Sequence, residues 1–375
     1  MEFRDLKRQY EYLKADIDKN IQCVINSTSF IGGEMIDRLE HDLAACVNVK
    51  HCITCANGTD ALQLALMAWG IGPDDAVFVP DFTFFSSGEV VSTVGATPVF
   101  VDVRKDTFNI SIKSLEEQIN IVKEQGKLKP RVIIAVDLFG QPAEYDEIRK
   151  ICDKEGLLLL EDGAQGFGGS IGDKKACSFG DISTTSFFPA KPLGCYGDGG
   201  AVFTNNDEWA ELIRSYKVHG KGTNKYDNVR IGMNSRLDSI QAAVLLAKLP
   251  VFMTEEVEKS DRAAAKYTEA LKQVVRTPVV LKGYSSSWAQ YTIQLKNRET
   301  RDSLQAYLKE QGIPSMIYYQ KPLHRQGAFA ELTYDNSEYP NTISLCDTVL
   351  SLPFHSYMDD EEIAEVADSI NKGID

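Results

Sequence analysis

The chain has 375 residues, of which 43% are hydrophobic and 25% are charged, and its formal net charge is -14. This length favours two domains over one, and the balance of residue types is typical of an ordinary soluble globular protein. The acidic charge argues against a nucleic-acid partner, because nucleic-acid binding needs a basic patch.

The first residues, MEFRDLKRQYEYLK, carry charges where a signal peptide needs an apolar core, so we expect no secretion signal. Apolar runs long enough to span a bilayer are missing, and we expect a cytoplasmic protein with no membrane partner. The eight cysteines are then expected to be mostly free thiols. Cys52 and Cys55 form a CxxC without a second pair or suitably spaced histidines, so we expect a buried strand there and no metal site.

Short apolar runs alternate with helical patterns through the first two-thirds of the chain. The runs are AVFVP (76–80), TPVFVDV (97–103), VIIAVDL (132–138), LLLLED (157–162), ISTTSFF (182–188) and AVFT (201–204). Uninterrupted apolar strands interleaved with helices predict an α/β fold whose sheet is mostly parallel and covered on both faces. Ligands bind such sheets at the carboxyl ends of the strands, so the residues after each run are the first candidates for chemistry.

The character of the chain changes after a long helical stretch at residues 239–272. WAQYTIQL (288–295) alternates like a half-buried strand, and residues 299–312 have a helical pattern. We therefore predict two domains, a large α/β domain over residues 1–250 and a smaller C-terminal α+β domain over residues 251–375.

The first candidate for chemistry is the turn in CANGTDALQLALMAW (55–69), where Gly58 and Thr59 precede a helical apolar stripe. A small turn that opens a helix leaves several backbone N–H groups unpaired, and the helix dipole adds roughly half a positive charge there. That combination suits a phosphate. Taken alone, the motif is explained more simply as an ordinary helix cap by Asn57 or Thr59.

The second candidate is LLLLEDGAQGFGGS (157–170), in which Glu161 and Asp162 stand at the carboxyl end of a strand that should be buried. Adjacent residues of a strand point to opposite faces, so only one of the two carboxylates can face a given site. A buried carboxylate needs a cation or strong donors. One of them could face a cationic ring nitrogen, and the alternative is a solvated strand end.

The third candidate is Lys191 in SFFPAKPLGCYGDGG (186–200), where prolines on both sides and four glycines predict a stiff loop. Burial among apolar groups lowers the pKa of a lysine from its usual value of about 10.4, which suits Schiff-base chemistry with an aldehyde. The alternative is a lysine whose amine reaches water. Together the three candidates predict a pyridoxal phosphate site, because that cofactor combines a phosphate, a ring nitrogen and an aldehyde.

These motifs resemble the DegT/DnrJ/StrS group of sugar-nucleotide aminotransferases. The similar segments cover essentially the whole chain and are FIGG (30–33), ANGTDAL (56–62), FVPDFTFFSS (78–87), PVFVDV (98–103), LFGQPAEYD (138–146), EDGAQGFG (161–168), SFFPAKPLGCYGDGGA (186–201), GMNSRLDSIQAA (232–243) and LSLPFHS (350–356). The resemblance implies the fold of aspartate aminotransferase, a fold-type I pyridoxal phosphate-dependent transferase, with the cofactor in the large domain.

The resemblance also implies a role for each matching residue at the cofactor. Lys191 would form the Schiff base with pyridoxal phosphate and would afterwards carry a proton between two carbons of the adduct. Asp162 would keep the pyridinium nitrogen protonated, Gln165 would hydrogen-bond the ring hydroxyl, and Phe84 would stack on the ring.

Further roles concern the phosphate, the partner subunit and the substrate. The phosphate would be bound by Gly58, Thr59 and Ser186. Asn234 would reach the phosphate of the neighbouring subunit, so the resemblance implies a homodimer with shared active sites. The side chains that would face the substrate are Arg236, Tyr318 and Tyr319.

The implied amino donor is L-glutamate, giving 2-oxoglutarate, and the implied acceptor is a keto sugar linked to a nucleotide. Residues 186–201 and 232–249 look most similar to enzymes that aminate UDP-2-acetamido-2-deoxy-3-keto-D-glucuronate at C3. In those enzymes an arginine matching Arg236 meets the sugar carboxylate, and a planar guanidinium suits a carboxylate through two parallel bonds. The product would serve surface polysaccharide biosynthesis, such as that of lipopolysaccharide O-antigen.

Three alternatives remain open from the sequence. One is a 4-aminotransferase acting on a UDP-4-keto-6-deoxy-hexose. Another is a regulatory protein that binds pyridoxal phosphate or a sugar nucleotide without turnover. A third is a pyridoxal enzyme that acts on amino acids alone, such as a desulfurase, for which Cys195 would be the nearby thiol. His219 and His324 are interpreted as structural histidines and are not assigned to catalysis.

Overall fold

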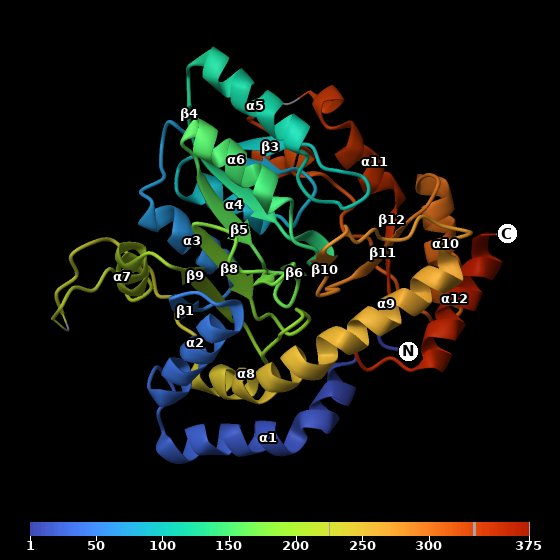
Figure 1. Ribbon diagram of the computed structural model, residues 1–375, viewed down its shortest axis with the longest axis horizontal. Coiled ribbons are helices and arrows are strands. Elements are labelled where there is room, and N and C mark those ends of the chain that lie inside the picture. Colours follow the sequence, from blue (N-terminus) through green and yellow to red (C-terminus); the bar gives the residue numbers. More distant parts are fainter. Residues whose placement is uncertain (225, 333–334, 375) are drawn as a thin grey trace.

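The computed structural model describes residues 1–224, 226–332 and 335–374. In this described part of the chain, the centre of the molecule is a seven-stranded sheet with the order β1-β9-β8-β5-β4-β2-β3 (Figure 1). Its strands are β1 (His51–Cys55), β2 (Asp75–Pro80), β3 (Thr97–Val101), β4 (Lys129–Val136), β5 (Leu158–Asp162), β8 (Ile182–Ser186) and β9 (Gly200–Thr204). Within this sheet β9 alone runs antiparallel to its neighbours, so the predicted mostly parallel α/β fold is confirmed.

Each predicted apolar run lies on one of these strands, and the strands are buried because helices cover both faces of the sheet. The alternation along β4 shows this directly: Val132 and Ile134 belong to one apolar cluster, and Ile133 and Ala135 to the cluster on the other face. In the same way Cys52 and Cys55 of β1 lie in different clusters, as predicted for a buried strand.

The helices of this part cover both faces of the sheet, except the first, which packs on the last. They are α1 (Leu6–Ser27), α2 (Glu34–Val47), α3 (Gly58–Ala68), α4 (Ser86–Thr93), α5 (Ile112–Gln125), α6 (Tyr145–Glu155), α7 (Asp207–Tyr216) and α8 (Ser239–Val251). Helices α3, α4 and α7 contribute to one apolar cluster, and α5 and α6 to the cluster on the opposite face. Below them in Figure 1, α1 lies along α8.

The C-terminal third forms a separate apolar cluster on the right of Figure 1. Its elements are α9 (Val257–Leu271), β11 (Tyr291–Gln294), α10 (Arg298–Glu310), β12 (Val349–Leu352) and α12 (Asp360–Ile374), whereas α11 (Pro340–Thr348) packs on the cluster of the central sheet. A π-helical turn over Phe252–Glu256 joins α8 to α9, so the helical stretch predicted for 239–272 is nearly continuous. The division of the chain at residue 250 stays a prediction.

Two smaller features complete the fold. Strands β6 (Ser170–Ile171), β7 (Lys174–Lys175) and β10 (Tyr284–Ser285) form a short sheet, and β11 pairs with β12 in antiparallel fashion. Over the residues that the structure describes, every helix is too short or too polar to cross a membrane.

Candidate active site

The candidate residues gather at one edge of the central sheet because of its topology. Strands β1 and β8 both run antiparallel to β9, so they are parallel to each other, and β8, β5, β4, β2 and β3 follow with the same direction. Their carboxyl ends therefore meet at a single edge, which is where ligands bind in sheets of this kind. The segments that follow β1, β2 and β8 hold Gly58, Phe84 and Lys191, and Asp162 is the last residue of β5.

The turn after β1 is pressed against the end of β8. Asn57 caps α3, since its side chain accepts a hydrogen bond from the backbone N–H of Asp60 at 2.8 Å. A Cβ on Gly58 would lie 2.8 Å from the Cβ of Ser186, and a Cβ on Gly200 would lie 2.5 Å from the carbonyl carbon of Asn57. Glycine is therefore required at both positions, and the N-terminus of α3 is held beside Ser186.

Thr59 adds a hydroxyl to the group formed by Gly58, Ser186 and the N-terminus of α3, hereafter the cradle. Its Oγ1 lies 2.7 Å from Oγ of Ser86, at the start of α4. The structure thus brings together the three residues expected at the phosphate, Gly58, Thr59 and Ser186, at a helix N-terminus that favours an anion. The cap by Asn57 and the cradle exist side by side, so the simpler interpretation of this motif does not exclude the functional one.

Asp162 is the carboxylate of the pair that faces this edge. It is buried, its Oδ2 accepts a hydrogen bond from Ser87 Oγ at 2.8 Å, and its Oδ1 accepts one from the N–H of Ala164 at 3.2 Å. Burial raises the pKa of Asp162, while the bond from Ser87, the charge of Lys191 and the bond from Ala164 act in the opposite direction. The side chain is thus a buried carboxylate that would gain from a further cationic donor.

Glu161 points to the other side of the strand, as the alternation of strand residues requires. It is fully buried, and its carboxylate accepts hydrogen bonds from Ser183 Oγ and from the N–H of Phe179, both at 2.7 Å. The N–H groups of Cys177 and Gly180 also donate to it. Glu161 therefore ties β5 to the loop before β8 and has a structural role.

Lys191 lies in the tight loop that follows β8. Its N–H donates to the carbonyl of Phe188 at 2.8 Å, and its own carbonyl accepts a hydrogen bond from Arg4 Nη2 at 3.0 Å. Burial lowers the pKa of the Lys191 amine; the charge of Asp162 opposes this shift, and that of Arg4 adds to it. Lys191 therefore lies close enough to Asp162 for their charges to interact, and its role at a cofactor stays a prediction.

Gln165 and the aromatic residues line the same region. Gln165 Oε1 accepts a hydrogen bond from the N–H of Phe139 at 2.7 Å, and its Nε2 lies 3.4 Å from the hydroxyl of Tyr319. The rings of Tyr319 and Phe84 have centroids 6.4 Å apart. Phe84 is 55% exposed, so a face of its ring is free to cover a planar ligand. Tyr318 packs on the rings of Tyr319, at 5.7 Å, and of Phe3, at 6.4 Å.

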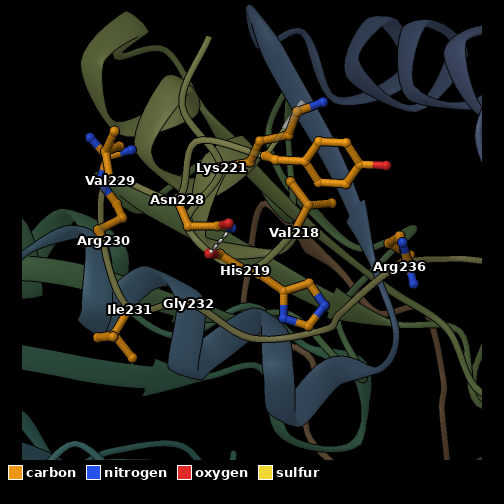
Figure 2. Close-up of a pocket in the computed structure, with 10 residues that line it drawn as sticks. Val218, His219, Lys221, Asn228, Val229, Arg230, Ile231, Gly232 and Arg236 are labelled. Atoms are coloured by element: carbon orange, nitrogen blue, oxygen red, sulfur yellow. Dashed lines mark hydrogen bonds between the residues drawn. The ribbon is translucent and has the colours of Figure 1, made fainter. Parts of the chain in front are cut away.

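Asn234 and Arg236 lie on the arm that leads from α7 to α8, and both are exposed. Arg236 borders an open hollow of about 1020 Å³ on this arm, and Figure 2 shows it at one end of the hollow with Arg230 at the other. Asn234 forms an isolated bridge with Val218. The approach of Asn234 and Arg236 to a neighbouring subunit's site stays a prediction.

Two residues considered in the sequence are structural in the fold. His324 Nδ1 lies 2.6 Å from Asp81 Oδ2, and its Nε2 lies 2.9 Å from Asn336 Oδ1, as expected for a hydrogen-bonded structural histidine. Cys195 is buried with its Sγ near the carbonyl of Phe187 at 3.1 Å, and burial raises its pKa to about 11. A thiol of this kind is a poor nucleophile, which weakens the desulfurase alternative.

Sequence reasoning missed two residues that touch the candidate site. Ser87 is part of the segment FVPDFTFFSS, but only Phe84 was singled out there. The helical start of α4 after β2 was the signal that would have placed this hydroxyl at the sheet edge. Arg4 is 187 positions away from Lys191, and nothing in the local pattern indicates their contact.

Comparisons with known proteins agree with this geometry. Residues 11–371 match the family described as the DegT/DnrJ/EryC1/StrS aminotransferase family. A UDP-2-acetamido-2-deoxy-3-oxo-D-glucuronate aminotransferase of Pseudomonas aeruginosa is 43% identical over 97% of both chains. A protein of Geobacillus stearothermophilus named as a pleiotropic regulatory protein is 41% identical over 98% of this chain and 96% of its own.

A solved structure gives the same picture. The crystal structure of a DegT DnrJ EryC1 StrS aminotransferase from Brucella abortus is 47% identical, covers 100% of this chain and 99% of its own, and superposes with a TM-score of 0.97. The predicted fold is therefore confirmed over the whole chain. The chain belongs to the DegT/DnrJ/EryC1/StrS aminotransferase family and is a pyridoxal phosphate-dependent enzyme.

Proposed function

We propose that the protein transfers an amino group from L-glutamate to C3 of UDP-2-acetamido-2-deoxy-3-keto-D-glucuronate. The observation that carries the proposal is the meeting of Lys191, Asp162 and the N-terminus of α3 at one sheet edge. The choice of sugar is supported by the name of the Pseudomonas aeruginosa relative, which covers nearly the whole chain. The product would enter surface polysaccharide biosynthesis in the cytoplasm.

The residues present fit pyridoxal phosphate. Gly58, Thr59 and Ser186 would hold the phosphate, because a Cβ at position 58 would close the space beside Ser186. The buried carboxylate of Asp162 would meet the ring nitrogen, and the exposed ring of Phe84 would cover the ring face. When bound, the cofactor supplies an electron sink and an aldehyde for amine exchange.

Within this arrangement Lys191 would act as the proton carrier. Burial lowers the pKa of its amine, so more of it is uncharged near neutral pH than is usual for a lysine. An uncharged amine can take a proton from one carbon of the bound substrate and return it to another. Asp162, held by Ser87 and Ala164, would keep a negative charge on the opposite side of the site.

Gln165 would orient the ring hydroxyl. Its oxygen already accepts from the N–H of Phe139, and its amide nitrogen donates one N–H to the Tyr319 hydroxyl at 3.4 Å, so the second N–H of the amide would serve the ring hydroxyl. Tyr319 would thus stand between the cofactor ring and the sugar, and Tyr318 would lie farther out beside Phe3.

The carboxylate of the sugar would be met by Arg236. Because this arginine and Asn234 are exposed on the arm between α7 and α8, we propose that they complete the site of a second subunit in a homodimer. An arginine that pairs with a carboxylate in two parallel bonds would distinguish the glucuronate from a neutral sugar.

The first test locates the cofactor. Borohydride reduction of the loaded enzyme followed by peptide mass mapping is expected to find the cofactor on Lys191. An adduct on a different side chain, or none, would contradict the proposed role. Lys191→Arg keeps the positive charge, but its guanidinium cannot release a proton at neutral pH. We expect this variant to lose turnover and to retain the fold, as measured by circular dichroism.

The second test identifies the acceptor sugar. Steady-state assays would compare the UDP-3-keto-glucuronate with a UDP-4-keto-6-deoxy-hexose, and we expect a higher kcat/KM for the former. Equal or better turnover of the neutral 4-keto sugar would favour the 4-aminotransferase. The regulatory alternative has some support in the name of the Geobacillus stearothermophilus relative. It would be favoured if L-glutamate left the visible absorbance of the loaded protein unchanged.

A further inference from the structure

The N-terminal segment before α1 is fixed to the C-terminal third of the chain. The carbonyl of Phe3 accepts a hydrogen bond from the N–H of Phe354 at 3.0 Å, and the ring of Phe3 packs on Tyr318. Five residues later, Arg8 donates two hydrogen bonds to the carboxylate of Glu362, each at 2.9 Å. The residue between these anchors, Arg4, is therefore held in a defined place.

From this place Arg4 reaches the loop of the candidate Schiff-base lysine. Its Nη2 donates a hydrogen bond of 3.0 Å to the carbonyl of Lys191. A second cation holds the same loop, because the buried amine of Lys248 on α8 donates to the carbonyl of Gly194 at 2.7 Å. The backbone around Lys191 is thus tied by two positively charged side chains that lie far from it in the sequence.

The charges around Lys191 come from several elements. Asp162 at the end of β5 favours the charged amine, while burial and the guanidinium of Arg4 favour the uncharged one. Behind Arg4, Lys248 adds to the positive side and Glu256 to the negative side. Burial lowers the pKa of His355 to about 4, so this neighbour is uncharged near neutral pH. Arginine keeps its charge throughout the working range of pH, so Arg4 is a permanent positive charge in this surrounding.

We propose that Arg4 is a positioning residue for Lys191, because it ties the backbone of the lysine's loop to the N-terminal segment and places a permanent positive charge beside that loop. The inference rests on the proposed role of Lys191. An arginine at this place would offset the effect of Asp162, whose negative charge is needed at the ring nitrogen but would otherwise hold the amine in its charged form. The site would thereby keep an ionised carboxylate and a reactive amine at the same pH.

The experiment is a pH titration of the visible absorbance of the pyridoxal phosphate-loaded enzyme, for the wild type and four variants. This absorbance reports the protonation of the Lys191 nitrogen in its link to the cofactor, where a nearby positive charge acts in the same direction as on the free amine. Arg4→Met removes the charge and the hydrogen bond, Arg4→Gln keeps a donor without charge, and Arg4→Lys keeps the charge. Lys7→Met is the matched control, since it removes a positive charge from the same segment but from a side chain that is 85% exposed.

We expect the titration of Arg4→Met and Arg4→Gln to move up by about one pH unit, with Arg4→Lys much closer to the wild type and Lys7→Met unchanged. The pH profile of kcat should move in the same direction. If the absorbance of Arg4→Met and Arg4→Gln titrates with the same midpoint pH as that of the wild type, the inference is overturned. If Arg4→Met does not fold, Arg4→Gln decides alone.

A failure of this inference is distinguishable from a failure of the proposed function. Borohydride mapping on the same preparations reports whether the cofactor is linked to Lys191. An adduct on Lys191 together with an unmoved titration rejects only the role of Arg4, whereas an adduct elsewhere rejects the function on which it rests.

Discussion

Replacing Ser87 by alanine tests how the buried carboxylate of Asp162 is held. The hydroxyl of Ser87 donates to Asp162 Oδ2 at 2.8 Å, and both side chains are buried. The substitution removes one of the two hydrogen bonds that the structure gives this carboxylate, the other coming from the N–H of Ala164. Because both side chains are buried, we expect bulk water not to take the place of the lost hydroxyl, so the loss of this hydrogen bond should appear in full in the free energy of unfolding.

The size of the effect follows from the charge of the acceptor. A hydrogen bond to an ionised group contributes about 1.5 to 3 kcal/mol, against about 1 kcal/mol for a neutral pair. Ser86→Ala is the matched control, because its neighbouring hydroxyl in α4 pairs with the neutral hydroxyl of Thr59. For a chain of this size we expect the thermal midpoint to fall by about 2 to 4 °C for Ser87→Ala and by about 1 °C for the control.

The pH dependence gives a second criterion. Burial raises the pKa of Asp162 above its unfolded value, so this group stabilises the folded state at low pH and loses that contribution as the pH rises through its folded pKa. Removing the Ser87 bond raises that pKa further. The deficit of Ser87→Ala relative to the wild type should therefore be largest at alkaline pH and shrink as the pH falls.

The assay is thermal unfolding of the cofactor-free protein by circular dichroism between pH 5.5 and pH 8.5, with the two variants measured in parallel. If Ser87→Ala loses no more than Ser86→Ala at pH 8.5, Ser87 does not hold an ionised carboxylate and the reasoning is refuted. A deficit that grows toward acidic pH would refute it as well.

Three further predictions follow from single contacts. Gly58→Ala should lower the free energy of unfolding by about 1 to 3 kcal/mol and weaken cofactor binding in a fluorescence titration, because its Cβ would collide with Ser186. The control Gly327→Ala should change neither quantity, since its Cβ would meet nothing within 4 Å. Arg236→Met should raise the KM of the glucuronate substrate at least about tenfold and leave the L-glutamate half-reaction intact, as measured by stopped-flow absorbance. Burial opposes a charge on His324, but its hydrogen bond to the buried carboxylate of Asp81 outweighs this effect and raises its pKa. The stabilisation that His324 provides is therefore fully present below the unfolded pKa of 6.5 and is lost as the pH rises through the folded pKa. We expect His324→Gln to lower the unfolding temperature more at pH 6 than at pH 8.5, as measured by thermal unfolding.

The sheet and its functional edge were predictable from the sequence because their signals are local. A strand buried on both faces must be apolar along its whole length, and the run LLLLED appears in the structure as β5 with its carboxylates at the expected end. The direction of the strands then follows from the helices between them, so the edge at which Asp162 and Lys191 meet could be inferred before any contact was known.

Contacts between distant segments could not be predicted in this way. The hydrogen bond from Arg4 to the carbonyl of Lys191 depends on how α1 lies along α8 and on the anchoring of Phe3 at residue 354, and no periodicity encodes either. The approach of Ser186 to Gly58 likewise depends on β1 and β8 flanking the antiparallel strand β9, a topology that composition does not specify.

The sequence alone could not decide whether Glu161 or Asp162 faces the site, because the decision depends on the hydrogen-bond donors around each carboxylate. Strand alternation states only that the two carboxylates face opposite ways. The surroundings decide what each can do: Glu161 receives four donors, three backbone N–H groups and the hydroxyl of Ser183, which fill the acceptor positions of a carboxylate. Asp162 receives two, from Ser87 and Ala164. A carboxylate has about four acceptor positions, so Asp162 retains capacity for a charged ring N–H, whereas Glu161 could bind such a group only by releasing the loop before β8.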